Sequence, residues 1–212
     1  KKKHAKQIEI DMNNLSLFKE IIKENPTTKL FFYKLYFKEV LDGGGFDVVI
    51  GNPPYVRQEK IKELKALKEI QDFDSYCGTA DLYIYFFEKG YRLLKENGVL
   101  SYITSNKYTR AKYGKDFRKF LLENANIKEY IDFNGVKVFE SATVDTSILS
   151  YQKSIIKNNT FTYCKVDEKY KKDDKLIEFV NKKGFQYSQN DLDIDSFSFA
   201  TLDELKIKKQ IQ

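Results

Sequence analysis

The sequence is poor in the residues that build metal centres, disulfides and acid–base relays. It has two cysteines, Cys77 and Cys164, and one histidine, His4, among its 212 residues. Two distant cysteines form neither a disulfide framework nor a metal site. We therefore expect reduced structural thiols in a cytosolic bacterial protein, with no metal ion and no His-based relay.

Signals for secretion or membrane insertion are also missing. The sequence has no leading methionine, no signal peptide and no long apolar run, and its first residues (Lys-Lys-Lys-His) read as an entry from within a longer protein. We expect the chain to be a fragment. Its 37 Lys and Arg residues exceed its 31 Asp and Glu residues, giving a formal net charge of +6. This mild positive charge suits a polyanionic partner without requiring one.

The clearest chemical pattern lies in residues 46–55. The apolar residues 48–50 predict a fully buried strand of a parallel sheet, and Gly51 then leads into Asn-Pro-Pro-Tyr at residues 52–55. Two consecutive prolines lack N–H groups and hold φ near about −65°, so the strand must end there. Ligands of open α/β folds bind at the carboxyl ends of strands. We expect the site at this turn.

The residue types of this turn fit one kind of substrate. Asn52 offers an amide oxygen and Pro53 a backbone carbonyl, so two acceptors converge on one point. Such a pair suits an exocyclic amino group, whose two N–H bonds it would engage. The amino nitrogen is then drawn towards tetrahedral geometry and its lone pair is freed to attack a methyl group. Pro54 stiffens the turn and Tyr55 adds an aromatic face, and no side-chain nucleophile is needed.

The stretch resembles motif IV of the amino-group DNA methyltransferases that use S-adenosylmethionine, in its N6-adenine form. Residues 46–57 (Phe-Asp-Val-Val-Ile-Gly-Asn-Pro-Pro-Tyr-Val-Arg) are similar to the gamma-class catalytic domain of TaqI-like type IIG restriction-modification enzymes. The similarity covers residues 30–153, and 180–212 more weakly. The resemblance implies a site-specific methyltransferase that transfers a methyl group to adenine N6 of a flipped-out base in double-stranded DNA.

The same resemblance assigns roles to individual residues. Residues 80–90 and 93–100 are similar to motifs V and VI, which would place Phe86 with Pro54 and Asn52 at the cofactor. Residues 136–140 and 146–153 resemble motif VIII, in which an aromatic ring stacks on the extruded base. Phe139 and Tyr55 would then hold the adenine between them. Residues after the motif VI strand are candidates for phosphate contacts, namely Lys107, Tyr108 and Arg110.

Two parts of the family pattern have no match in the sequence. The Gly-rich loop that would hold the methionine part of the cofactor is missing, because the one dense glycine cluster, residues 43–45, lies directly before motif IV. The target-recognition domain is missing too. We expect the chain to need an upstream cofactor loop and a downstream recognition domain from the rest of its own polypeptide.

The apolar pattern predicts an α/β fold, a partial Rossmann-like sheet that is mostly parallel and ends in an antiparallel hairpin. Its helices are expected over residues 61–70, 81–95, 117–122, 173–181 and 202–211. Its strands are expected over 48–50, 99–104, 127–133, 146–151 and 161–166, the last two forming the hairpin, and the apolar and aromatic run at 30–37 predicts either a strand or a buried segment. We predict an upstream helical segment (1–29), the catalytic half of the methyltransferase domain (30–167) and a linker (168–212).

Two other functions remain open. Asn-Pro-Pro-Tyr also occurs in methyltransferases that modify a glutamine side-chain amide, but 160 residues follow Asn52, including the Phe139 loop, which disfavours that substrate. A non-catalytic DNA-binding fragment is the second alternative, against which the intact Asn52 and Tyr55 argue. Residues upstream of Lys1 would discriminate between these classes, because a Gly-rich loop after a strand marks a cofactor site.

Overall fold

The computed structural model describes residues 33–66, 68–139, 145–170 and 175–199, and the chain divides into two compact units, residues 1–38 and 39–212. In the first unit, the described part contains helix α2 (Tyr33–Tyr36), whose Tyr33 and Tyr36 are exposed. The prediction of a strand or a buried segment over residues 30–37 is therefore wrong for residues 33–36. The predicted helical segment 1–29 and the expected helix at 202–211 lie outside the described residues.

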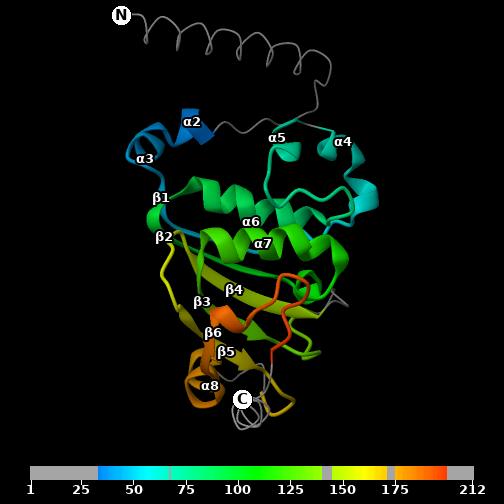
Figure 1. Cartoon of the computed structure of the whole chain (residues 1–212), viewed down its shortest axis with the longest axis vertical. Coiled ribbons are helices and arrows are strands. Elements are labelled where there is room, and N and C mark those ends of the chain that lie inside the picture. Colours follow the sequence, from blue (N-terminus) through cyan, green and yellow to red (C-terminus); the bar gives the residue numbers. More distant parts are fainter. Residues whose placement is uncertain (1–32, 67, 140–144, 171–174, 200–212) are drawn as a thin grey trace, which may run out of the picture. The chain divides into compact units, whose positions relative to one another are not determined.

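The second unit alternates strands with helices (Figure 1). Its strands are β1 (Phe46–Gly51), β2 (Leu94–Ser105), β3 (Asn126–Asp132), β4 (Thr146–Gln152), β5 (Thr160–Lys165) and β6 (Phe185–Ser188). Helix α3 (Lys38–Asp42) begins at the unit boundary, and it is followed by α4 (Lys62–Lys65), α5 (Lys68–Gln71), α6 (Leu82–Leu93), α7 (Lys115–Asn124) and α8 (Leu176–Lys183). Short 3₁₀ helices are η1 (Gln58–Lys60), η2 (Asn106–Thr109), η3 (Lys112–Gly114) and η4 (Gln189–Asp191).

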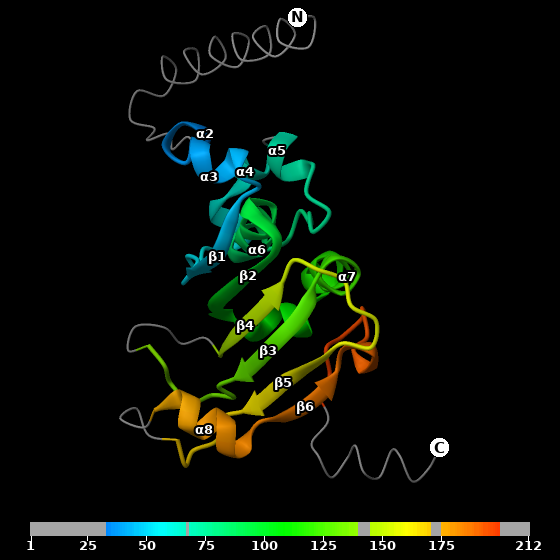
Figure 2. The same ribbon diagram turned by 90° about the vertical axis from the view of Figure 1, so that its left-hand side faces the viewer.

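The six strands form one sheet in the order β1-β2-β4-β3-β5-β6, and Figure 2 shows β4 inserted between β2 and β3. Strand β1 is parallel to β2, and β3 is parallel to β5, whereas β4 is antiparallel to both of its neighbours and β6 is antiparallel to β5. Strands β1, β2, β3 and β5 therefore point the same way. The predicted α/β class is confirmed. The sheet is mainly parallel in the sense that these four strands share one direction, although three of the five strand pairings are antiparallel.

The predicted hairpin between β4 and β5 is wrong, because β3 lies between them. The connection from β4 to β5 crosses the start of β3 and is fixed there by side-chain amides. Asn126 donates to Ser154 Oγ (2.7 Å) and accepts from the Ile156 N–H (2.9 Å), while Asn159 donates to the Ile127 carbonyl (2.7 Å). A polar turn between two apolar strands favours a hairpin in sequence, but these long-range bonds stabilise a crossover instead.

Each face of the sheet has its own core. On one face, α6 and α7 pack on the strands through residues such as Phe87, Phe117 and Tyr151. On the other face, α8 covers β3 and β5 with a smaller cluster that includes Ile131, Cys164 and Val180. Strand β1 adds neither Val48 nor Ile50 to these two clusters. Both side chains lie on the second face and remain 59% and 76% exposed. The expectation of a fully buried strand is therefore wrong for β1, which is an edge strand with one covered face.

Residues 175–199, within the stretch predicted as a linker, contribute a helix and a strand to the second unit. Helix α8 packs on β5, and β6 extends the sheet as its last strand. The chain then returns across the first face, where Phe199 stacks on Tyr130 and Tyr163 with ring centroids 4.5 and 4.6 Å apart. The sequence did not predict this packing, because charged residues separate the aromatic residues along the chain.

Across the described residues, no helix is long and apolar enough to cross a membrane.

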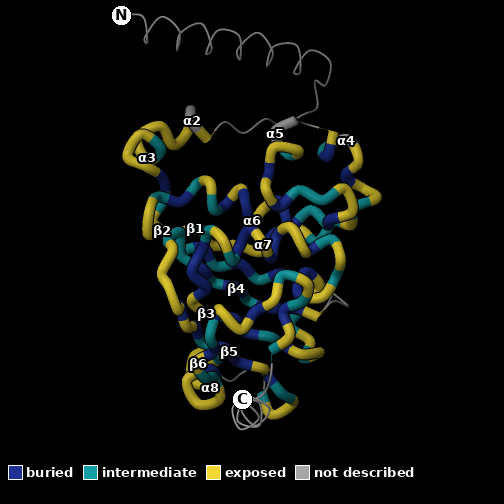
Figure 3. Tube along the Cα trace, in the orientation of Figure 1, coloured by how far each residue is buried: buried dark blue, intermediate teal, exposed yellow. Residues whose placement is uncertain are grey.

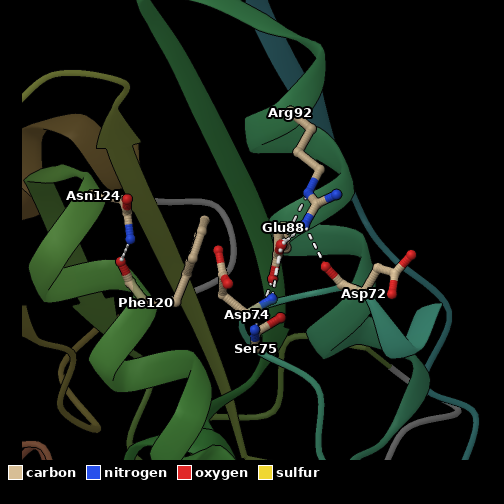
Figure 4. A network of polar contacts seen from close by, with 7 residues as sticks. All are labelled: Asp72, Asp74, Ser75, Glu88, Arg92, Phe120 and Asn124. Atoms are coloured by element: carbon tan, nitrogen blue, oxygen red, sulfur yellow. Dashed lines mark hydrogen bonds and ion pairs between the residues drawn. The ribbon is translucent and has the colours of Figure 1, made fainter. Parts of the chain in front are cut away.

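A buried carboxylate fixes the loop that precedes α6 (Figure 4). The Glu88 side chain is fully buried and accepts hydrogen bonds from the backbone N–H groups of Asp74 (3.1 Å) and Ser75 (2.8 Å). Arg92, one turn further along α6, donates to the same carboxylate at 2.6 and 2.9 Å and to the Asp72 carbonyl at 2.9 Å. Glu88 therefore sets where this loop lies relative to α6.

Candidate active site

The Asn-Pro-Pro-Tyr turn leaves the sheet directly after β1. Asn52 and Pro54 are exposed, whereas Pro53 between them is buried. The turn closes through a hydrogen bond from the Val56 N–H to the Pro54 carbonyl (2.9 Å). The buried proline anchors the backbone while the Asn52 amide stays open to a ligand, which is the arrangement that a preorganised acceptor requires.

Tyr55 connects the turn to the neighbouring strand. Its half-buried hydroxyl donates to the Ile103 carbonyl of β2 at 3.4 Å, and its ring meets the edge of Tyr83 on α6 with centroids 6.5 Å apart. Burial raises the pKa of Tyr55 to about 12. Tyr55 therefore remains a neutral hydrogen-bond donor at physiological pH, and its position is set by β2.

Phe139 lies against Tyr55, the residue with which the resemblance would have it hold the target base. The two ring centroids are 6.4 Å apart with an interplanar angle of 68°, an edge-to-face contact, and Phe139 is half-buried. Two rings that sandwich a base would be parallel, with the base between them. The structure thus brings together two aromatic residues that lie far apart in the sequence.

Sequence reasoning missed a polar group behind Tyr55. The Asp81 carboxylate accepts from the Gln58 N–H (3.1 Å), and the Leu82 N–H donates to the Val56 carbonyl (3.0 Å), so the start of α6 holds the segment that follows the turn. Tyr113 extends this group, since its hydroxyl lies 2.8 Å from that of Tyr83. An aspartate at the first residue of the helix predicted over 81–95 was the available signal, because aspartate is a common N-cap residue.

Phe86 occupies a position on α6 that differs from that of its neighbours. Its side chain is 38% exposed, whereas Tyr85 and Phe87 on either side are buried. Phe86 is therefore not a core residue, and its ring offers apolar surface to a ligand. The shared role of Phe86 and Pro54 at the cofactor stays a prediction.

The three candidates for phosphate contacts after β2 separate into two kinds. Lys107 and Arg110 are exposed. Tyr108 is fully buried, with its ring 5.7 Å from that of Phe87 and 5.3 Å from that of Phe117, and desolvation raises the pKa of its hydroxyl. The prediction of a DNA contact by Tyr108 is wrong, because the 3₁₀ helix η2 turns this ring into the core.

An open cavity of about 410 Å³ lies beside η2, at the ends of β3 and β5. Its wall carries exposed Arg110 and Lys165 together with the carboxylates of Asp132 and Asp145. In the part of the chain that the structure describes, no three His, Cys, Asp or Glu residues are arranged to hold a metal ion.

The fold is that of the methyltransferases. The chain superposes with a TM-score of 0.54 on the type I restriction-modification methyltransferase subunit from Streptococcus thermophilus, with 18% sequence identity over 69% of this chain and 35% of that one. At this level of identity the likeness establishes the Rossmann-like fold alone, and it confirms the predicted fold class.

The chain belongs to the Eco57I restriction-modification methylase family, whose model matches residues 1–139. It is 31% identical over 131 residues to the type II methyltransferase M.BstVI of Geobacillus stearothermophilus, and 35% identical over 120 residues to the type II restriction enzyme and methyltransferase RM.Eco57I of Escherichia coli. These alignments cover 59% and 55% of the chain but only 23% and 12% of the two relatives. The predicted resemblance to restriction-modification methyltransferases is confirmed.

Proposed function

We propose that this chain supplies the acceptor side of a DNA methyltransferase that modifies adenine N6 in a restriction-modification system of the bacterial cytoplasm. The observation that carries the proposal is the exposed Asn52 amide at the end of β1, next to the contacting rings of Tyr55 and Phe139. An acceptor beside an aromatic surface is what a flipped base with an exocyclic amino group requires. The family membership of the chain and the names of its relatives support the same class of reaction.

The proposed chemistry needs no nucleophilic side chain. Asn52 Oδ1 and the Pro53 carbonyl accept the two N–H bonds of the adenine amino group, so the nitrogen lone pair turns out of the ring plane. S-adenosylmethionine, when bound, supplies the electrophilic methyl group. With the cofactor bound, the amino nitrogen would take the methyl group as the sulfur–carbon bond broke, and it would release one proton to solvent. Holding both reactants in line contributes much of the rate.

The residues present fit one wall of a cofactor site. Pro54 and Phe86 are both exposed, and apolar surface of this kind suits an adenine ring. We propose that the rest of the site, with the Gly-rich loop, comes from another part of the same polypeptide. Lys107 and Arg110 are the proposed contacts to DNA phosphates, since both are exposed at the end of β2.

The test of the reaction is methyl transfer by the complete polypeptide to unmethylated double-stranded DNA. Nucleoside analysis of DNA treated with S-adenosyl-[methyl-³H]methionine should show N6-methyladenine. Labelled N4-methylcytosine would keep the amino-group chemistry but contradict the adenine assignment. Label in a glutamine amide of a protein substrate, with none in DNA, would favour the glutamine methyltransferase class.

The 212-residue chain alone is expected to bind S-adenosylmethionine weakly and to transfer no methyl group. The described residues supply the acceptor turn and part of one apolar wall, so most of the contacts to the cofactor are missing. Its association with DNA should be weak, non-specific and sensitive to salt. Calorimetric titration with S-adenosylmethionine measures this directly. A dissociation constant in the low micromolar range would show instead that the cofactor site is complete within this chain.

Phe139→Ala should weaken the binding of a flipped base by about 1–3 kcal/mol, which is the contribution of one base–aromatic stack. Phe139 is only half-buried, so the melting temperature of the variant should remain near that of the wild type. The matched control is Phe133→Ala, since Phe133 lies near the start of the same loop but is buried in the smaller core. Its loss should destabilise the fold by about 3–5 kcal/mol. Equal melting shifts in the two variants would identify Phe139 as a core residue.

A further inference from the structure

The loop that carries Phe139 joins β3 to β4, and both of its ends are bonded to one residue, Asn106, at the start of η2. Asn106 follows β2 directly and is only 3% exposed. Its side-chain N–H₂ donates to Asp132 Oδ1 (3.1 Å) at the end of β3, and its backbone N–H donates to the Asp145 carbonyl (3.0 Å) just before β4. Asn106 therefore contacts both ends of the loop, at the end of β3 and just before β4.

Further hydrogen bonds make these two ends rigid. The Phe133 N–H donates to the Thr146 carbonyl (3.1 Å), which closes the base of the loop. Asp132 Oδ1 also accepts from the Asn134 N–H (3.0 Å), so the same carboxylate that Asn106 holds begins the turn into the loop. Without the Asn106 side chain, the segment after β2 would lose its hydrogen bond to Asp132 at the end of β3.

The position of Asn106 has a consequence for the two aromatic residues of the site. Tyr55 is hydrogen-bonded to the Ile103 carbonyl near the end of β2. The Phe139 loop is hydrogen-bonded to Asn106, three residues later in the chain. Both rings are thus placed relative to one short piece of β2. A buried amide bound to a carboxylate fixes geometry, because a shift of either group would leave the buried amide without its partner at a cost in free energy.

We propose that Asn106 is a positioning residue that sets the separation of Phe139 from Tyr55 and so the slot for the target base. The inference rests on the proposed function and adds a residue to it that touches neither the base nor the cofactor. Asn106 acts on the base only through the loop, and its effect must therefore depend on Phe139.

The decisive experiment is a double-mutant cycle in the complete polypeptide. The probe is a duplex with 2-aminopurine at the adenine that the wild-type protein methylates, whose fluorescence reports the flipped base. Asn106→Ala should weaken binding of this duplex about 5- to 30-fold, within the range of a lost base stack. In a Phe139→Ala background the same change should have almost no further effect. Equal losses in the two backgrounds would overturn the proposal.

An exchange of the two side chains tests the hydrogen bond itself. Asn106→Asp alone places two carboxylates against each other and should impair base binding, whereas Asn106→Asp combined with Asp132→Asn restores the bond with donor and acceptor reversed. The double variant should recover most of the wild-type binding. Failure of this rescue, with both single variants folded, would contradict the proposed role.

The matched control is Asn126→Ala at the opposite end of β3. Asn126 is also buried, and its amide also bonds a neighbouring segment, at Ser154. Its loss should lower stability without changing base binding by the folded protein, and an effect equal to that of Asn106→Ala would overturn the proposal. If the wild type neither methylates DNA nor flips the base, the proposed function itself fails. If Phe139→Ala weakens base binding but Asn106→Ala does not, only the role of Asn106 fails.

Discussion

Asn52→Ala should slow methyl transfer about 10²- to 10³-fold, the usual cost of removing one preorganised hydrogen-bonding group from an active site. Asn52 supplies one of the two proposed acceptors for the amino group, and the Pro53 carbonyl alone leaves one N–H bond unengaged. The nitrogen lone pair then stays conjugated with the ring. Initial rates of methyl transfer to DNA, measured with the complete polypeptide at saturating S-adenosylmethionine, give the comparison.

The Asn52 variant should keep its fold, because the side chain is exposed and follows the last residue of β1. Its melting temperature should therefore match that of the wild type. Asn181→Ala is a suitable control, since Asn181 is an exposed asparagine on α8, far along the chain from the turn. It should lose neither rate nor stability. A wild-type rate in Asn52→Ala would remove the acceptor role and, with it, the proposed mechanism.

The strands and the longer helices were predictable because their apolar patterns are strong and local. Strands β3 to β5 lie within one residue of their predicted ranges, and α6 begins one residue after the predicted start. Strand β2 begins at Leu94, five residues before its predicted start, so the end of the predicted helix at 81–95 is wrong. Pairing was not predictable from such patterns. The crossover at β3 depends on Asn126 and Asn159, whose partners lie about thirty residues away. The extent of burial of β1 depends on which elements cover Val48 and Ile50, and a strand sequence carries no information about them.

The candidate site was predictable where its functional residues are consecutive in the sequence. The turn at 52–55 and its place at the end of β1 follow from two prolines after an apolar strand. The resemblance placed Tyr55 and Phe139 on either side of the target base; in the structure their ring centroids lie 6.4 Å apart, and the role of the two rings at the base stays a prediction. Tyr108 was misassigned because a tyrosine in a polar stretch reads as accessible, whereas η2 directs it inward. Asn106 gave no signal, since one asparagine after a strand is ordinary.

Glu88→Ala should lower the free energy of unfolding by about 3 kcal/mol. The carboxylate is buried, and its charge-assisted bonds to two backbone N–H groups and to Arg92 are each stronger than bonds between neutral groups. The Ser75 N–H would stay buried without its acceptor. The Arg92 side chain is 44% exposed and regains water in the variant, which keeps the loss below that of a fully buried ion pair.

Thermal unfolding of the chain measures the effect, and a loss of this size corresponds to a fall of about 10 °C for a domain of this length. Glu88→Gln should fall in between, because its amide oxygen accepts some of the bonds without the charge. Glu123→Ala, on the exposed surface of α7, is the matched control and should change stability by less than about 0.5 kcal/mol. Similar melting temperatures for the Glu88 and Glu123 variants would show that the loop at residues 72–75 is held by other contacts, such as the Phe73 ring beneath the Arg92 guanidinium.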